Sequence, residues 1–144
     1  MDRVTFVTLL LLVFITNTSY AAKRIEGPIK GNVLKVLDGD TLEVRMDVWL
    51  NQQIETKLRI IGIDTPEIKG KCPFEREKAQ EAKKEIIRLI NDNFVTIYNI
   101  RYGKYAGRVI ADVKTADGIN LANYMLEKGL ARSYKGKKRK SWCG

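Results

Sequence analysis

The most strongly patterned stretch of the chain is residues 42–63, which read LEVRMDVWLNQQIETKLRIIGI. From Leu42 to Val48 apolar residues alternate with charged ones, and a period of two predicts a β-strand with one buried face. The polar residues 51–53 then provide a reversal, and residues 54–63 predict a return strand. The whole stretch therefore predicts an antiparallel β-hairpin.

The register of this hairpin follows if the chain reverses about Gln52. The expected pairs are Val44 with Ile60, Met46 with Leu58 and Leu42 with Gly62. The same register places the carboxylates of Asp40 and Asp64 opposite each other, with Cβ atoms about 5 Å apart. Such carboxylates repel unless a cation lies between them. Alternatively, both cap turns in water, since Asp-Gly and Asp-Thr are common turn dipeptides, and the spacing alone does not decide between these interpretations.

The segment RIIGIDTPE, residues 59–67, favours a shared cation. Pro66 cannot donate to a ladder and disfavours helical backbone at Thr65, so the strand ends there with the Thr65 carbonyl free of regular pairing. Two carboxylates and a carbonyl are hard oxygen donors of the kind that Ca²⁺ prefers. Glu67, which follows shortly after, is placed to hold a water molecule as a general base.

Arg59 presents a local inconsistency in this scheme. In a strictly alternating strand Arg59 and Asp64 point to opposite faces, yet both are needed at one site. A bulge or a strong twist is therefore required, and we expect it at Gly62.

The composition restricts the available chemistry. The 144 residues include 26 Lys and Arg, 17 Asp and Glu, no His and two Cys, with a formal net charge of +9. Without His the chain has no Ser-His-Asp or Cys-His relay and no His-ligated zinc site. Two Cys are too few for a four-sulfur zinc site. Carboxylates, Lys, Arg and Tyr remain, and these suit a hard metal ion and an anionic partner.

The first residues indicate export. Residues 4–15 are almost entirely apolar, a run shorter than the roughly 20 residues of a membrane-spanning helix. We predict a signal peptide over 1–21, cleaved after Ala21, with an uncleaved anchor as the alternative. The cleaved chain is expected in the periplasm or outside the cell, without stable membrane insertion. In that oxidising compartment Cys72 and Cys143 are expected to form a disulfide that pins the C-terminal tail, with free thiols as the alternative.

Four motifs occur in order along the rest of the chain. They are DGDT at 38–41, RIIGIDTPE at 59–67, KYAGR at 104–108 and GLA at 129–131. As a set they resemble the thermonuclease (staphylococcal nuclease-like) family. The resemblance implies an OB fold of the α+β class: a five-stranded β-barrel with one helix between the third and fourth strands and a second helix after the fifth.

The remaining pattern agrees with this layout. A short strand is expected over 33–37, an amphipathic helix over 74–90, strands over 94–100 and 108–113, and a second helix over 120–128. The expected organisation after the signal peptide is a polar lead-in at 22–30, a nuclease domain at 31–134 and a basic C-terminal tail at 135–144.

The resemblance also implies an activity. It is Ca²⁺-dependent hydrolysis of phosphodiester bonds in DNA and RNA, with little base specificity and 3′-phosphate products, by a monomer that favours single-stranded or denatured substrate. Carried over by motif, the metal ligands are Asp40, Asp64 and the Thr65 carbonyl, and the catalytic residues are Arg59, Glu67 and Arg108. Glu67 would act as the base or position the water, and the two Arg would bind the scissile phosphate. Asp38 would lie outside the ligand shell.

Three further residues are candidate substrate contacts. Lys104 and Tyr105 lie in the third motif, where Ala106 is an insertion relative to the type member. Tyr134 either stacks on a base or sugar or packs internally. The basic run 135–140 is either a solvated tail or a strip that follows a polyanionic backbone. Trp142 is assigned no catalytic role.

Two other functional classes remain as alternatives. One is an OB-fold protein that binds nucleic acid without cleaving it. The other is a basic exported protein that binds anionic surfaces through its tail. The presence of Arg59, Glu67 and Arg108 together favours the nuclease.

Overall fold

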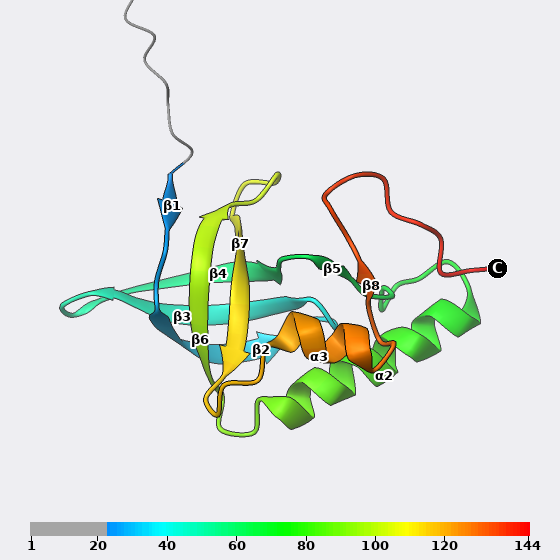
Figure 1. The fold of residues 1–144 in the computed structure, drawn as a ribbon, viewed down its shortest axis with the longest axis horizontal. Coiled ribbons are helices and arrows are strands. Elements are labelled where there is room, and N and C mark those ends of the chain that lie inside the picture. Colours follow the sequence, from blue (N-terminus) through cyan, green and yellow to red (C-terminus); the bar gives the residue numbers. More distant parts are fainter. Residues whose placement is uncertain (1–22) are drawn as a thin grey trace, which may run out of the picture.

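The computed structural model describes residues 23–144, and the expected signal peptide over 1–21 lies outside the described residues. The strands are β1 (Arg24–Ile25), β2 (Ile29–Val36), β3 (Thr41–Trp49), β4 (Gln52–Ile60), β5 (Ile63–Asp64), β6 (Phe94–Tyr102), β7 (Arg108–Thr115) and β8 (Arg132–Ser133). The helices are α2 (Pro73–Leu89) and α3 (Leu121–Glu127) (Figure 1). Within 23–144 no helix is both long and apolar enough to cross a bilayer.

The large sheet closes into a barrel. Its strand order is β1-β6-β2-β3-β4-β7, and β6 also pairs with β7, which joins the two sides. The β4–β7 contact is parallel and the others are antiparallel. Helix α2 lies between the third and fourth barrel strands, and α3 follows the fifth. The predicted α+β barrel of OB-fold type is confirmed.

The core forms where strand alternation and helix periodicity meet. Leu42, Val44 and Met46 of β3 are buried, as their alternation predicts. Helix α2 buries a stripe of Ala79, Ala82 and Ile86 at spacings of three and four residues. Helix α3 adds Leu121 and Met125. Both helices lie on the same side of the barrel (Figure 1), so the rest of its surface is left for the loops and the tail.

The predicted register of the β3–β4 hairpin is wrong. The observed pairs are Leu42 with Leu58, Val44 with Thr56 and Met46 with Ile54. The chain reverses at residues 50–51, earlier than expected, because Asn51 adopts a positive φ of 56°, which Asn tolerates. The register shifts by an even number of residues, so each side chain keeps its predicted face. Side-chain pattern alone therefore could not distinguish the two registers.

The described part of the polar lead-in expected over 22–30 includes strand structure. It contains β1, which pairs with β6, and β2 already begins at Ile29. Edge strands are held by backbone hydrogen bonds, so the polar side chains of this segment do not prevent pairing. Residues 29–32 pair with β6, and Gly31 and Asn32 also pair with β3, which extends the strand expected over 33–37 toward the N-terminus.

Candidate active site

The buried carboxylates of Asp40 and Asp64, which we call the acidic centre, lie close to the end of β4. Gly62 adopts a φ of +84°, which favours glycine, and the chain turns there into β5. Strand β5 leaves the barrel and pairs with β8, Asp64 lying opposite Arg132. The irregularity expected at Gly62 is thus a turn between two strands rather than a bulge within one. It brings the Arg59 Nη2 atom to 3.6 Å from the Asp64 Oδ1 atom.

Asp40 reaches the same centre from the turn before β3. Its Oδ1 accepts a hydrogen bond from Arg59 Nη1 at 2.5 Å, and its Oδ2 accepts one from the Thr65 amide at 3.0 Å. Asp40 is not directly opposite Asp64, because its carbonyl pairs with the amide of Ile60. The turn at Gly62 and the Arg59 guanidinium bring the carboxylates together instead. Their side chains are only 4% and 5% exposed.

The turn that carries Asp40 is tightly packed. A Cβ on Gly39 would lie 2.8 Å from the Ala82 Cβ of α2, so no larger residue fits without movement. Asp38 accepts a hydrogen bond from the Asp40 amide at 3.0 Å. Burial, together with the nearby Asp40 carboxylate, raises the pKa of Asp38 to about 6. Negative charge is therefore crowded at this turn.

Glu67 stands on the loop after Pro66, with its side chain 55% exposed. This loop is held by Glu75 in the first turn of α2, a buried carboxylate that accepts hydrogen bonds from the amides of Glu67 (3.3 Å) and Lys71 (3.0 Å). Glu75 was missed from the sequence, where its only signal was an acid in the first turn of a helix. It positions the backbone that carries Glu67.

The basic tail returns to the acidic centre, which the sequence did not predict. The Arg139 guanidinium donates to Asp64 Oδ1 from Nε at 2.5 Å, to the Thr65 carbonyl from Nη2 at 3.0 Å, and to the Glu67 carboxylate from Nη1. Trp142 lies beside it, and its Nε1 donates to Asp64 Oδ2 at 3.2 Å. In the sequence Arg139 was only one cation in a basic run.

A disulfide anchors this tail. Cys72, at the N-cap of α2, is bonded to Cys143, with the Cα atoms 6.0 Å apart. Trp142 is half-buried, and the Arg132 guanidinium lies 3.7 Å from the centre of its ring. Arg132 also donates to the carbonyl of Ser141 at 2.8 Å. The end of the chain is therefore held at several points over the acidic centre.

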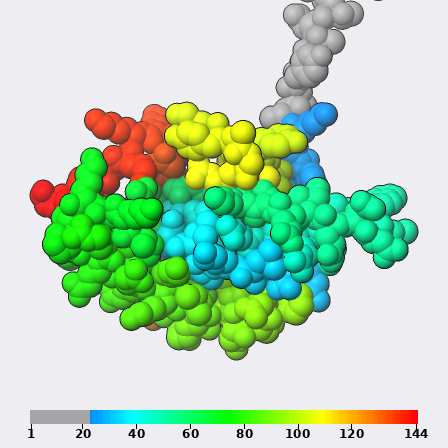
Figure 2. Space-filling model, turned by 180° about the vertical axis from the view of Figure 1, so that it is seen from behind, coloured from blue at the N-terminus to red at the C-terminus, as the bar shows by residue number. Residues whose placement is uncertain are grey.

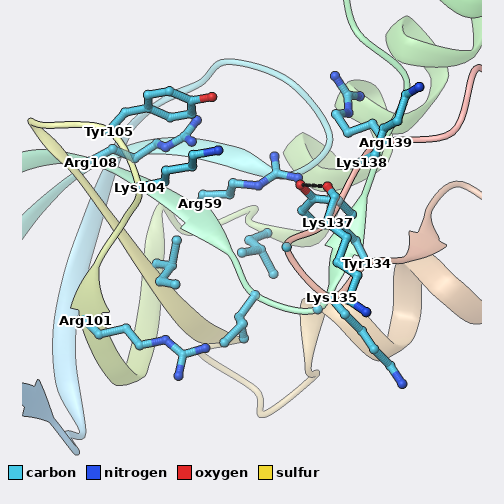
Figure 3. Close-up of a pocket in the computed structure, with 15 residues that line it drawn as sticks. Arg59, Arg101, Lys104, Tyr105, Arg108, Tyr134, Lys135, Lys137, Lys138 and Arg139 are labelled. Carbon is cyan, nitrogen blue, oxygen red and sulfur yellow. Dashed lines mark hydrogen bonds between the residues drawn. The ribbon is translucent and has the colours of Figure 1, made fainter. Parts of the chain in front are cut away.

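A cationic cavity of about 660 Å³ adjoins the acids (Figure 3). No acidic residue of the described chain lines it, and its charged lining consists of Arg59, Arg101, Lys104, Arg108, Lys135, Lys137, Lys138 and Arg139. Figure 2 shows the tail (red) and the loop before β7 (yellow) along the same edge of the molecule. Arg59 and Arg139 belong both to this lining and to the acidic centre. An anion in the cavity would thus meet positive charge next to the buried acids.

Arg108 is well placed in this cavity. It begins β7, and its buried Nε has no hydrogen-bond partner among residues 23–144. The Tyr105 ring lies against it, with the guanidinium carbon 5.0 Å from the ring centre. A second aromatic residue of the cavity lining, Tyr134, has its ring centre 5.5 Å from the guanidinium carbon of Arg59. The Tyr134 hydroxyl donates to the Lys137 carbonyl at 2.7 Å. A buried guanidinium N–H without a partner is costly, so an anionic acceptor suits this position.

Comparison with known proteins agrees with this arrangement. The model of the staphylococcal nuclease homologue family matches residues 57–142. The chain belongs to this family. Relatives from Escherichia coli and Escherichia coli O157:H7, each named uncharacterized endonuclease, are 31% identical to this staphylococcal nuclease homologue over 106 residues. The match covers 74% of this chain but only 61% of each relative, so the chain spans less than two thirds of their length.

The donor set of this staphylococcal nuclease homologue fits a hard divalent cation. Asp40, Asp64 and the Thr65 carbonyl offer oxygen donors, as Ca²⁺ prefers. The Thr65 hydroxyl is buried and has no partner within the described chain. The contacts of Arg139 with Asp64 and the Thr65 carbonyl show that these oxygens already accept a cationic group. The contacts of Arg59 and Arg139 link the predicted metal and base residues Asp40, Asp64, Thr65 and Glu67. Lys104, Tyr105, Arg108 and Tyr134 line the adjoining cavity.

Proposed function

We propose that this staphylococcal nuclease homologue is a cation-dependent nuclease that hydrolyses phosphodiester bonds. The observation that carries the proposal is the junction of a buried carboxylate pair with a cavity whose charged lining is entirely basic. Family membership and the endonuclease names of the two relatives support it. A phosphodiester is an anion and could approach the acids only alongside this positive charge.

The cation that we propose is Ca²⁺, held by Asp40, Asp64 and the Thr65 carbonyl. When bound, such an ion neutralises the acids and polarises a phosphoryl oxygen. The donors are all oxygens and include no nitrogen or sulfur, which favours a hard ion over zinc. The buried position of both carboxylates makes a compensating cation valuable.

The protein's own groups would supply the remaining chemistry. Glu67 is exposed at the edge of the acidic centre, where it can accept a proton from an attacking water molecule. Arg59 and Arg108 both line the cavity and offer guanidinium donors to the negative charge that grows on the phosphoryl oxygens. Glu75 acts through the backbone by holding the amide of Glu67.

The substrate that we propose is DNA or RNA, with single strands favoured and 3′-phosphate products. Lys104 can bind a flanking phosphate, and Tyr105 and Tyr134 offer aromatic faces on which bases or sugars can stack. None of these contacts depends on base identity, which fits low base specificity. We also propose that the protein acts as a monomer.

Export to the periplasm or the medium is part of this proposal. The apolar run at residues 4–15 supports a cleaved signal peptide. The Cys72–Cys143 disulfide supports an oxidising compartment, because cytosolic disulfides are rare. Extracting the protein from fractionated cells and sequencing its N-terminus would test both points. A protein retained in the cytosol with Met1 intact would contradict them.

A cleavage assay tests the activity. Purified protein is incubated with heat-denatured DNA or with RNA, in Ca²⁺ or in excess chelator, and the product ends are analysed. We expect cleavage in Ca²⁺ only, with products that a 3′-phosphatase must treat before ligation. Absence of cleavage in Ca²⁺, at mildly alkaline pH and across salt concentrations, would reject the nuclease.

One observation favours a second candidate, a nucleic-acid-binding protein that does not cleave. The Arg139 guanidinium contacts Asp64, the Thr65 carbonyl and Glu67, the groups that the nuclease would use. The same assay separates the two functions when binding is measured in parallel. Tight binding of single strands without cleavage at any Ca²⁺ concentration would favour the binding protein.

A further inference from the structure

Arg139 contacts the kind of oxygen atoms that a divalent cation such as Ca²⁺ would bind. One guanidinium reaches a buried carboxylate oxygen, a carbonyl oxygen and a second carboxylate, which come from Asp64, Thr65 and Glu67. Asp64 is 5% exposed and Arg139 is 35% exposed, so the ion pair is not an ordinary solvated surface pair. An arginine guanidinium is effectively always protonated in proteins, so Arg139 brings a full positive charge to these acceptors.

The guanidinium and a metal ion would compete for the same atoms. Asp64 Oδ1 and the Thr65 carbonyl oxygen accept from Arg139 at 2.5 Å and 3.0 Å. A Ca²⁺ ion needs oxygen ligands at about 2.3–2.6 Å, and two cations this close would also repel. Binding of one therefore requires departure of the other.

We propose that Arg139 is a built-in counterion of the acidic centre, which competes with the divalent cation and sets the cation concentration at which the centre fills. The inference rests on the proposed function only for the identity of the competing ion. When the ion binds, Arg139 is released. It also lines the cationic cavity, so its charge then remains available to a phosphate there.

The disulfide gives this competition its strength. Cys143 lies four residues after Arg139 and is bonded to Cys72, which keeps the guanidinium close to the acids even when it is released. Tethering of this kind raises the effective concentration of a binding group without any new contact. Trp142, which donates to Asp64, and Arg132, which stacks on Trp142, add further anchors.

Calorimetry tests the competition without any nuclease readout. Ca²⁺ is titrated into the oxidised protein as wild type, as Arg139→Gln and as Lys140→Gln. Lys140→Gln is the matched control. It removes one positive charge at the neighbouring position, and Lys140 makes none of the contacts with acidic groups that Arg139 makes. We expect Arg139→Gln to tighten Ca²⁺ binding about tenfold, or about 1.4 kcal/mol. Lys140→Gln should change the dissociation constant less than twofold.

Thermal unfolding gives an independent reading of the same variants. Without Ca²⁺, Arg139→Gln should lower Tm, because the acids lose their counterion. The rise in Tm on adding Ca²⁺ should be larger for Arg139→Gln than for wild type, since ligand stabilisation increases with affinity. Arg139→Lys, which keeps the charge but lacks the forked donors, should fall between the two.

The results distinguish this inference from the nuclease proposal. Equal Ca²⁺ affinity of wild type and Arg139→Gln, or weaker binding by the variant, would overturn the counterion while leaving a protein that still cleaves in Ca²⁺ as a nuclease. Tighter binding by Arg139→Gln in a protein that does not cleave would support the counterion and reject the nuclease. Lack of Ca²⁺ uptake by both proteins would overturn the counterion role.

Discussion

Replacing Arg59 with Met should destabilise the protein mainly through the two acids that it would leave behind. Arg59 donates to Asp40 Oδ1 at 2.5 Å and to the Ile63 carbonyl at 3.1 Å, and its Nη2 lies 3.6 Å from Asp64 Oδ1. Met keeps most of the apolar stem but removes the charge. Removing one partner of a buried ion pair costs about 3–5 kcal/mol. Arg139 still faces Asp64, so we expect about 3 kcal/mol, the lower end of that range.

Urea unfolding with and without Ca²⁺ measures this cost. In chelator the full loss should appear in the free energy of unfolding. In saturating Ca²⁺ the loss should shrink, because the ion replaces part of the missing positive charge. Arg45→Met is the matched control: Arg45 pairs with Glu55 on the surface, where both side chains are 41% or more exposed, and should cost under about 1 kcal/mol. If Arg59→Met costs no more than Arg45→Met, or if Ca²⁺ leaves its cost unchanged, the coupling of Arg59 to a cation-binding acid pair is refuted.

Three further outcomes are expected. Glu67→Gln and Arg108→Lys should slow cleavage by about 10² or more while the circular dichroism spectrum and single-strand binding are retained, and near-normal rates would exclude these roles. Glu75→Gln should lower stability by about 1–2 kcal/mol and speed hydrogen exchange of the loop amides that Glu75 binds, whereas unchanged exchange would contradict its positioning role. Hydrogen bonds from Arg88 and Tyr124 lower the pKa of Glu85 to about 2. Its stabilising contribution is therefore present above the ordinary pKa of about 4.5 and is lost as pH falls toward 2, so Glu85→Gln should flatten the stability profile over that window, as measured by urea unfolding.

The sequence predicted the class of fold because its signals are local. Alternation over β3, the apolar stripe of α2 and the break at Gly62 each arise within a few residues, and each occurs where it was expected. The β3–β4 register could not be predicted in this way, because a shift by an even number of residues leaves every side chain on the same face of the sheet. The positive φ of Asn51 determines where the chain turns, and nothing in the alternation of the strands specifies it.

The candidate site likewise contains residues that local motifs predict and contacts that they do not. Asp40, Asp64, Thr65 and Glu67 could be chosen from two short motifs, since turn chemistry and oxygen donors are encoded locally. The contacts of Arg139 with Asp64 and the Thr65 carbonyl join residues 75 and 74 positions apart, and a basic run carries no information about such a partner. The sequence alone thus determined the main barrel strands, the two helices and the chemical groups available. Only the tertiary structure decided which charges meet, because closure of the barrel and the disulfide set distances that no local pattern encodes.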